Sequence, residues 1–424
     1  MISDALLRRV LGTDRRVRRH GGTVRYFVTL GAIAVLLFWL GYQALLARTM
    51  YLALDMNDFG KFYYSTRLFL SGEDMYGPSP ATEIPVSAYE LQHFWNMNPP
   101  HFHLLILPLA RLTPGWALVA WWALGIGALV ASLRAIARAL DLRWTARGAF
   151  WTAFWLVVFS PTSITVFTGQ LSLILMLPVT LAWTAARRGA WTRAAVLLGV
   201  AASVKPFLAL FLPWLLLRRR ERAASVMAAT IIGGFAAGLL VFGAGSLRSW
   251  LEVLASMNWS WVPLNGSVAG LLSRTLSDSP RFVPVVEAPL VAWAVSLGAA
   301  AAIGLGALVV FSRDRSPRAI DRAFAGLLLT ALVVSPLGWI YYLFLAAGPL
   351  FALWRTFEAR TSRARDALLV AAVPGLIWPV AMTGLWRMTP WGALTFGSIY
   401  AWTMLALLGA VVADARAEAR PRAA

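Results

Sequence analysis

Long apolar segments alternate with short arginine clusters along almost the whole chain. A membrane-spanning helix needs about 20 consecutive apolar residues, and several segments reach that length. They lie near 24–47, 113–133, 223–244, 286–312, 365–384 and 393–412. The 424 residues are 59% hydrophobic and only 13% charged, which is far from the composition of soluble domains. This pattern predicts an integral membrane protein built from helices.

The distribution of the basic residues decides between a membrane protein and a nucleic-acid-binding protein. A net charge of +19 alone would suit either class. The arginines, however, fall between apolar segments, as in "RRVLGTDRRVRRH", "RRGAWTR", "RRRER" and "RDRSPRAIDR". This is the positive-inside pattern of multi-pass membrane proteins, so we expect no nucleic-acid partner. The chain has no cysteine, which excludes disulfides, thiol catalysis and zinc–thiolate sites.

Three further apolar blocks have basic clusters at both ends, so each is expected to enter and leave on one side of the membrane. They lie at about 148–186, 194–217 and 323–354 and are interrupted by "SPTSITVFTGQLS", "SVKPF" and "SPLGW". Irregular backbone at membrane depth is tolerated only where protein or a wet cavity surrounds it. We therefore predict a single domain over 1–424, an all-α polytopic bundle of about twelve transmembrane helices.

Positive-inside topology also sets the expected location of the loops and the ends of the chain. The basic segment 1–23 and the tail 413–424 are predicted to be cytoplasmic. The loops 48–112 and 245–285 are predicted to be external. Within the first loop, "HFHLLILPLARL" is too short to span, so we expect a re-entrant or interfacial helix there.

Two carboxylates follow the first apolar segment in "DMNDFGKFYY". Asp55 and Asp58 are three residues apart, which places both side chains on one face of a helix. The residues that follow suit an amphipathic helix at the membrane interface. A carboxylate facing a cavity could be catalytic, or the pair could cap the helix and stabilise its dipole. The spacing leaves both interpretations open.

The only two lysines, Lys61 and Lys205, both fall on the predicted external side. Lys205 lies in the break "SVKPF" of an apolar block, where an ionisable residue is costly and usually functional. A lipid phosphate is its expected counter-charge, and a lysine that extends to the headgroups is the alternative. Arg274 in "NGSVAGLLSRTL" is a second phosphate candidate, with a surface arginine on lipid headgroups as its alternative.

The histidines and late aromatics are the remaining candidates for chemistry. His93, His101 and His103 cluster in "HFWNMNPPHFH", but their spacing is poor for a metal site. Trp339 and the tyrosines that follow it come directly after a Ser-Pro helix break. There they could stack on a sugar or a lipid.

Six pieces of the chain, in this order, resemble a known family. They are "DFGKFYYSTRLFLSGEDMYG", "NPPHFHLLILPLARL", "GQLSLILMLPVTLAW", "KPFLALFLPWLLLRRR", "NGSVAGLLSR" and "SPLGWIYYLFL". Together they are similar to polyprenyl-phosphate-sugar-dependent glycosyltransferases of the GT-C type. That family includes mycobacterial phosphatidylinositol-mannoside mannosyltransferases and the arabinan-branching arabinofuranosyltransferase.

The resemblance implies a role for each candidate residue. Asp58 is implied as the catalytic general base and Asp55 as either a helper or a bystander, while Lys205 and Arg274 are expected to bind the donor phosphate. Residues of the matching pieces are expected to line the substrate cavity: Tyr63, Tyr64, His101, Gln170, Asn265, Trp339, Tyr341 and Tyr342. The family often has histidines where this chain has Tyr341 and Tyr342.

These residues and the resemblance together predict the reaction. Mannose or arabinofuranose would pass from a polyprenyl-phosphate donor to a glycolipid or glycan acceptor on the external face of the cell membrane. A single carboxylate fits inversion at the anomeric carbon, and cations can stabilise the departing lipid phosphate, so we expect no cofactor and no metal. A polytopic transporter or lipid-linked-sugar flippase is the alternative, and a structural scaffold is a third class.

Overall fold

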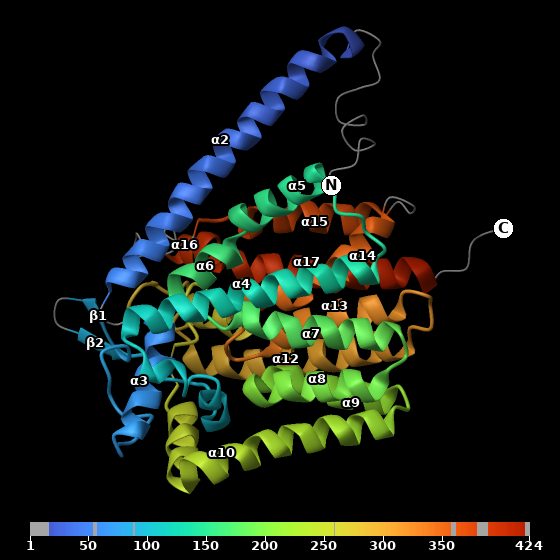
Figure 1. Cartoon of the computed structure of the whole chain (residues 1–424). Helices are drawn as coiled ribbons and strands as arrows, with labels where there is room; N and C mark the ends of the chain where they lie inside the picture. The colour runs from blue at the N-terminus through green and yellow to red at the C-terminus, as the bar shows by residue number, and fades with distance from the viewer. Residues whose placement is uncertain are drawn as a thin grey trace.

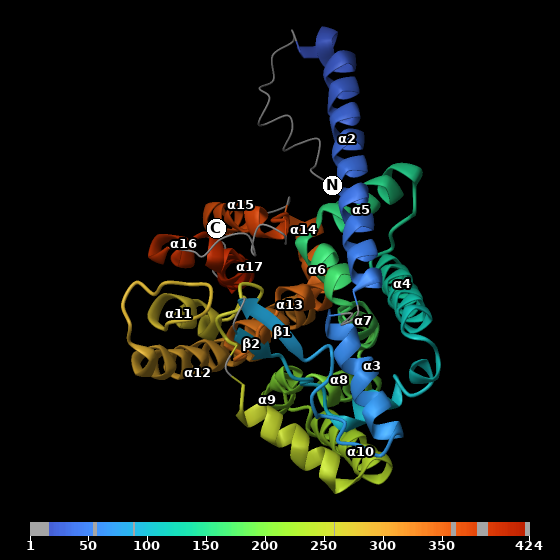
Figure 2. The ribbon, with the colours of Figure 1, turned by 90° about the vertical axis from the view of Figure 1, so that its left-hand side faces the viewer.

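A computed structural model describes residues 17–53, 57–87, 90–257, 259–357, 362–379 and 389–419. Most helices from α4 onward run roughly side by side, and α2 rises from them at a slant (Figure 1). Helix α3 and a β-hairpin gather at one end of these helices, and α17 finishes at the other end. Figure 2 looks onto the first of these ends, where the hairpin appears between α3 and α11.

The N-terminal part consists of one long helix, a shorter one and an irregular loop. Its elements are α2 (Val17–Leu52), α3 (Asn57–Leu70), β1 (Glu83–Ser87), β2 (Glu90–His93), η1 (Pro100–Leu104), η2 (Leu109–Arg111) and α4 (Pro114–Ala139). The strands form an antiparallel hairpin, which the sequence analysis did not predict. Two 3₁₀ turns lie where a re-entrant or interfacial helix was expected. Pro114 begins α4 after Thr113, because proline's fixed φ suits the first helical position.

The two middle blocks are broken where the sequence analysis placed their interruptions. They comprise α5 (Ala146–Val158), α6 (Ser160–Thr168), α7 (Ser172–Arg187), α8 (Trp191–Val204), η3 (Pro206–Leu210) and α9 (Phe211–Leu217). Helices α5 and α6 meet at an angle of 61°. Helix α8 stops before Pro206, because proline disfavours helical geometry in the residue before it.

The remaining helices complete the bundle. They are α10 (Glu221–Ala255), α11 (Val268–Leu276), α12 (Pro289–Arg313), α13 (Ala319–Val334), η4 (Ile340–Ala346), α14 (Ala347–Phe357), α15 (Arg363–Leu376), α16 (Pro390–Leu394), η6 (Phe396–Ser398) and α17 (Ile399–Ala419). Helix α10 is kinked at Gly243, whose φ of 78° and ψ of 168° are not helical. The Ser267 hydroxyl caps α11 by accepting a hydrogen bond from the Gly270 N–H at 3.0 Å.

The expectation of a helical membrane bundle is confirmed, but the expectation of about twelve crossings is not. Within the described residues, five segments are long and apolar enough to span. They are the segment that begins in α2 at Leu30, Pro114–Ala139, Glu221–Ala255, Pro289–Arg313 and Pro390–Glu418. The bent α5–α6 pair would make a sixth. The other helices of the broken blocks have 16 residues or fewer, about 24 Å at most, and a bilayer core is about 30 Å thick.

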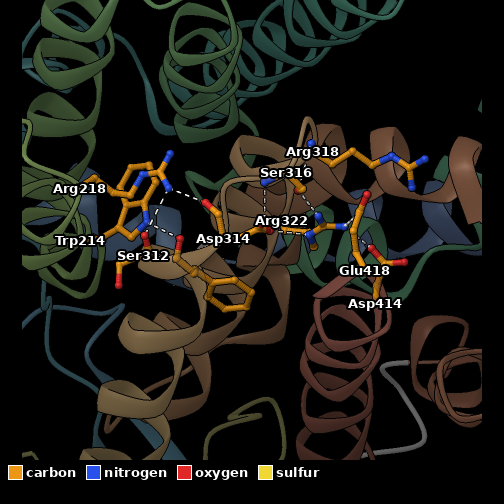
Figure 3. A network of polar contacts seen from close by, with 10 residues as sticks. Trp214, Arg218, Ser312, Asp314, Ser316, Arg318, Arg322, Asp414 and Glu418 are labelled. Carbon is orange, nitrogen blue, oxygen red and sulfur yellow. Dashed lines mark hydrogen bonds and ion pairs between the residues drawn. The ribbon is translucent and has the colours of Figure 1, made fainter. Parts of the chain in front are cut away.

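A paired-charge network holds the end of the bundle that lies away from α3. Arg322 of α13 is fully buried and forms ion pairs with Asp314 at 2.7 Å, Asp414 at 2.8 Å and Glu418 at 2.6 Å (Figure 3). Arg365 of α15 pairs with the second oxygen of Asp414 at 3.4 Å. The network thereby joins the α12–α13 loop, α13, α15 and α17.

Candidate active site

Asp58 lies in the first turn of α3 with both carboxylate oxygens hydrogen-bonded. Lys61 Nζ donates to Oδ1 at 2.5 Å, and Gln170 Nε2 donates to Oδ2 at 2.6 Å. The aspartate and lysine side chains are 19% and 7% exposed. Each carboxylate oxygen has two lone pairs, so the group can still accept a proton from a substrate. Asp55, the expected helper, lies outside the described residues.

The approach of Gln170 to Asp58 depends on Gly169, which ends α6. Gly169 has a φ of +64°, in the left-handed region. A Cβ there would lie 2.5 Å from Met50 Cε and 2.6 Å from Phe59 Cβ. The Trp121 indole also donates to the Gly169 carbonyl at 2.8 Å. Only glycine combines this backbone conformation with such close packing against the start of α3.

Lys205 is a partly buried cation of the site. Its Nζ donates to Asn98 Oδ1 at 2.7 Å and lies 5.3 Å from the centre of the Tyr342 ring. An ammonium group has three N–H donors, and one of them is directed at this amide. The described residues give Lys205 no carboxylate ion pair. Such a group can offer two donors and an uncompensated positive charge to an anionic ligand.

Tyr342 joins the carboxylate side of the site to the lysine side. Its hydroxyl is 3.5 Å from Gln170 Oε1, and its ring lies below Lys205. Tyr341 is also buried, and its ring stacks on Trp339 with 14° between the planes and 6.0 Å between the centroids. Asp58, Gln170, Lys205 and Tyr342 therefore form one cluster, brought together from α3, the α6–α7 turn, the α8–η3 break and η4.

Asn265 holds the segment "NGSVAGLLSR" against the segment "SPLGWIYYLFL". Its Oδ1 accepts from the N–H groups of Gly338 at 2.8 Å and Ser267 at 3.1 Å. Its Nδ2 donates to the carbonyls of Ser260 and Pro336, both at 2.9 Å. The side chain is fully buried and all its hydrogen-bonding groups are occupied. Asn265 thus positions the segment that carries Trp339, although the sequence analysis expected it to line the cavity.

Arg274 is fully buried in α11 and holds the preceding loop. Its Nη1 donates to the carbonyls of Val262 at 3.0 Å and Asn265 at 3.1 Å, and its Nε donates to Ser398 Oγ at 3.0 Å. Nη2 has no hydrogen-bond partner among the described residues. Burial lowers the pKa of Arg274 to about 9, so the guanidinium remains charged at neutral pH. In the described part of the chain it forms no hydrogen bond or ion pair with Asp58 or Lys205.

His103 anchors a polar network behind Asn98. Thr66 Oγ1 donates to the Phe62 carbonyl at 2.9 Å, so it accepts from His103 Nδ1–H at 2.8 Å. His103 Nε2 then accepts from Asn96 Nδ2 at 2.8 Å. Complete burial lowers the pKa of His103 to about 3, which keeps the imidazole neutral.

Asn96 carries the network from His103 to Asn98, the partner of Lys205. Asn96 Oδ1 accepts from the Asn98 backbone and side-chain N–H groups, both at 3.1 Å. Asn96 and His103 each have a second hydrogen-bond partner, so the network fixes the position of Asn98 on the side away from Lys205. This network therefore orients the amide that holds Lys205.

His101 has a different environment from His103, which argues against a shared metal site. It packs against Gly238 of α10, where a Cβ would lie 2.9 Å from the His101 backbone nitrogen. The side chain is only 8% exposed, and neither ring nitrogen has a hydrogen-bond partner among the described residues. Buried polar atoms are normally hydrogen-bonded, so this imidazole is one of the exceptions in the described part of the chain.

The two tyrosines of α3 lie away from the cluster. The Tyr63 hydroxyl donates to the Leu112 carbonyl at 2.8 Å, and both Tyr63 and Tyr64 line a cavity with residues before α4. The structure thus brings Asp58, Gln170, Lys205, Tyr341 and Tyr342 into one region. It places Tyr63, Tyr64, Asn265 and Arg274 around that region instead.

The sequence analysis assigned no role to three residues that contact the cluster. Lys61 is paired with Asp58 and lies 5.5 Å from the Phe94 ring and 5.8 Å from the Trp259 ring. Asn96 and Asn98 support Lys205 as described above. The sequence could have indicated these residues, because "NMN" and the lysine of "DFGKF" are polar residues within apolar stretches.

Comparison with known proteins identifies the family to which this chain belongs. The model of glycosyltransferase family 87 matches residues 96–336, more than half of the chain. The matched segment contains Gln170, Lys205 and Asn265. The chain therefore belongs to glycosyltransferase family 87.

Named relatives agree with this family. The chain is 30% identical, over 57% of its length and 55% of the relative's, to a polyprenol-phosphate-mannose-dependent alpha-(1-2)-phosphatidylinositol mannoside mannosyltransferase of Mycolicibacterium smegmatis. It is 28% identical to the polyprenol-phosphate-mannose-dependent alpha-(1-2)-phosphatidylinositol pentamannoside mannosyltransferase of the same organism. That alignment covers 73% of this chain and 75% of the relative. A Mycobacterium tuberculosis protein with the same name as the first relative is 27% identical to this chain. The alignment covers 86% of this chain and 85% of that protein. The first of these alignments thus spans only about half of the relative.

Proposed function

We propose that this protein transfers mannose from a polyprenyl-phosphate donor to a mannose-bearing phosphoglycolipid, without a metal and with inversion at the anomeric carbon. The cluster of Asp58, Gln170, Lys205 and Tyr342 carries the proposal, because it combines a carboxylate with a cation that has free donors. The relatives named above support mannose as the sugar and a phosphatidylinositol mannoside as the class of acceptor. No relative named there transfers arabinofuranose.

Asp58 is proposed to activate the acceptor. A sugar hydroxyl is a weak nucleophile, and a carboxylate within hydrogen-bond reach can take its proton as the new bond forms. Lys61 and Gln170 fix both oxygens of Asp58, so the carboxylate needs little reorganisation when the substrate arrives. Neither Tyr341 nor Tyr342 is suited to act as a second base at neutral pH, because a phenol has an ordinary pKa near 10.

Lys205 is proposed to stabilise the leaving group. As the acceptor oxygen bonds to the anomeric carbon, the bond from that carbon to the phosphate oxygen breaks. The lipid phosphate leaves with the electron pair, and charge-assisted hydrogen bonds from Lys205 stabilise it. Arg274 acts on the same region through the loop that it holds, and its Nη2 has no hydrogen-bond partner among the described residues.

The active cluster is proposed to face the extracytoplasmic side of the cell membrane. The arginine clusters at the opposite ends of the helices support this orientation. The chain has no cysteine, so Pro80→Cys introduces a single labelling site. A membrane-impermeant maleimide should label it from outside intact cells; labelling only in inverted vesicles would contradict the orientation.

A reconstituted assay separates the enzyme from the transporter alternative. Purified protein in liposomes would receive labelled polyprenyl-phosphate-mannose and phosphatidylinositol mannoside, and the glycolipid product would be weighed by mass spectrometry. We expect an acceptor heavier by one mannose only when both substrates are present. Movement of the labelled donor across the bilayer, without a heavier acceptor, would instead establish a flippase.

A further inference from the structure

A cavity lies on the face of α3 that is turned away from Asp58. Its volume is about 360 Å³, and its walls include Tyr63, Tyr64 and Arg67 of α3 together with Arg111 and Thr113. A second hollow of about 180 Å³ shares Tyr64 and Arg67 with it. The two hollows together follow the exposed side of α3.

The cavity is positively charged without an internal counter-charge. Arg67 and Arg111 are both exposed, and neither has a carboxylate ion pair among the described residues. Arg67 Nη1 donates only to the Ala110 carbonyl, at 3.3 Å. Structural arginines elsewhere in this chain behave differently, since Arg322 and Arg365 are paired with carboxylates. The charge in the cavity is therefore available to an external anion.

The residues around the cavity place it at a membrane interface. Pro114, which lines the cavity, begins an apolar spanning helix. Trp116 in the first turn of that helix is 68% exposed, and Leu70 and Leu112 are 50% and 41% exposed. Exposed tryptophan beside exposed leucine is typical of the level where headgroups meet acyl chains. An anion that reaches the two arginines is therefore expected to come from a lipid.

The cavity is separate from the transfer cluster. Arg67 follows Asp58 by nine positions, which at 3.6 residues per turn places the two on opposite faces of α3. Asp58 contacts Gln170 on one side, and Arg67 contacts Ala110 on the other. A lipid bound at Arg67 would thus contact the face of α3 opposite to the face that carries Asp58.

We propose that this cavity binds the phosphodiester of an anionic membrane phospholipid from the leaflet next to α3. Guanidinium groups match phosphate oxygens with paired hydrogen bonds, and two of them converge on this cavity. The bound lipid steadies α3, so that the lipid composition of the membrane influences turnover. Binding itself does not depend on the proposed function, and only its influence on turnover does.

Native mass spectrometry of the full-length protein in detergent tests the proposal. The probe is phosphatidylglycerol, phosphatidylcholine is the neutral comparison, and phosphatidylinositol mannoside is added in a separate measurement. We expect the wild type to retain phosphatidylglycerol at least tenfold better than the double variant Arg67→Gln, Arg111→Gln. The matched control is Arg188→Gln, Arg193→Gln, which removes two exposed arginines at the opposite end of the helices and should leave retention unchanged. The double variant Arg67→Lys, Arg111→Lys keeps the positive charge but lacks the planar guanidinium groups, so it should retain an intermediate amount of phosphatidylglycerol.

Each other outcome overturns the proposal. Equal retention by the wild type and the glutamine variant would show that the cavity does not hold the lipid. An equal loss of phosphatidylglycerol retention in the control variant would show that the effect comes from the change in net charge and not from this cavity. Retention of phosphatidylinositol mannoside alone would assign the cavity to the acceptor instead. If the double variant fails to elute as a monodisperse protein, Arg111→Gln alone decides, because Arg111 is exposed and its side chain has no hydrogen bond among those described.

Discussion

The two ends of the helical bundle differ in how completely their buried and partly buried charges are paired. At the Arg322 end, arginines and carboxylates pair with one another, and Asp414 serves Arg322 and Arg365 at once (Figure 3). At the Asp58 end, Lys61 pairs with Asp58, but Lys205 contacts an amide oxygen and an aromatic ring and has no carboxylate ion pair among the described residues. His101 has no partner for either ring nitrogen among the described residues.

The difference indicates which charges are structural and which are kept for substrate. A buried ion pair that is fully satisfied has no remaining interaction to offer a ligand. A cation that is removed even partly from water without a counter-ion carries an energetic cost, and such groups often occur at functional sites. The comparison predicts that variants at the Arg322 end lose stability first, whereas variants at the Asp58 end lose activity first.

The largest expected effect on stability is that of Arg322→Met. Removing the guanidinium leaves the buried Asp414 and the partly buried Asp314 and Glu418 without their shared cation, and Asp414 keeps its ion pair with Arg365. Breaking a buried ion pair in this way typically costs about 3–5 kcal/mol. The thermal midpoint in detergent should fall strongly, and Arg315→Met, at an exposed position, should change it little. Equal midpoints for the two variants would mean that the network does not stabilise the fold.

At the other end, Lys205→Met should act on the reaction rather than on folding. Methionine keeps the length and the contact with Tyr342 but removes the donors available to phosphate. A hydrogen bond to a charged group is worth about 1.5–3 kcal/mol, so turnover at limiting donor should fall about 10- to 100-fold. The thermal midpoint should remain close to that of the control Arg188→Met. Normal turnover at limiting donor would remove Lys205 from the phosphate site.

Gly169→Ala tests how tightly the α6–α7 turn must approach α3. The added methyl group would overlap Met50 and Phe59, and overpacking of this kind costs about 1–3 kcal/mol. Gly189→Ala is the matched control, because Gly189 also has a positive φ, 73°, but has no atom within 4 Å of the added Cβ. Gly169→Ala should therefore lose more stability and more turnover than Gly189→Ala. Similar losses in both would show that backbone strain alone is responsible.

A smaller effect is expected from the pH dependence of His103. Its pKa is about 3 in the folded chain and 6.5 when unperturbed, so between these values the unfolded state binds one proton more. Stability should fall as the pH drops below 6.5, by up to about 1.4 kcal/mol per pH unit from this group.

His103→Gln should flatten this acid limb, because glutamine does not titrate. The control His93→Gln, at an exposed position, should leave the slope unchanged. Thermal midpoints measured between pH 7.5 and 4.5 give the comparison. An unchanged slope in His103→Gln would mean that other groups govern acid sensitivity.

The sequence predicted the elements of the fold better than the depth of each helix. The apolar segments and their breaks at "SVKPF", "SPLGW" and "SPTSITVFTGQLS" were found where expected, because proline and glycine interrupt helices by local sterics. The number of crossings was not confirmed, since hydrophobicity does not distinguish a spanning helix from a short one buried among other helices. The β-hairpin was missed because it lies in a polar loop without a strong alternating pattern.

The candidate site was predicted in composition but not in arrangement. Asp58, Gln170 and Lys205 were named from the sequence, and the structure brings them together with Tyr342. Asn265 and Arg274 were also named, yet their polar atoms are occupied mainly by backbone groups. Which polar side chains are satisfied by the protein depends on tertiary contacts, and these cannot be read from residue type or spacing.

The central claim is that Asp58 accepts the proton of the acceptor, and Asp58→Asn tests it most directly. Asparagine keeps the size of the side chain but cannot take the proton, so mannose transfer should fall on the order of 10²-fold or more. Retention of the polyprenyl-phosphate-mannose donor should persist, because Lys205 is intact, and Asp55→Asn should transfer at close to the wild-type rate. If Asp58→Asn transfers mannose as fast as the wild type, Asp58 is not the base and the assignment of this cluster is wrong.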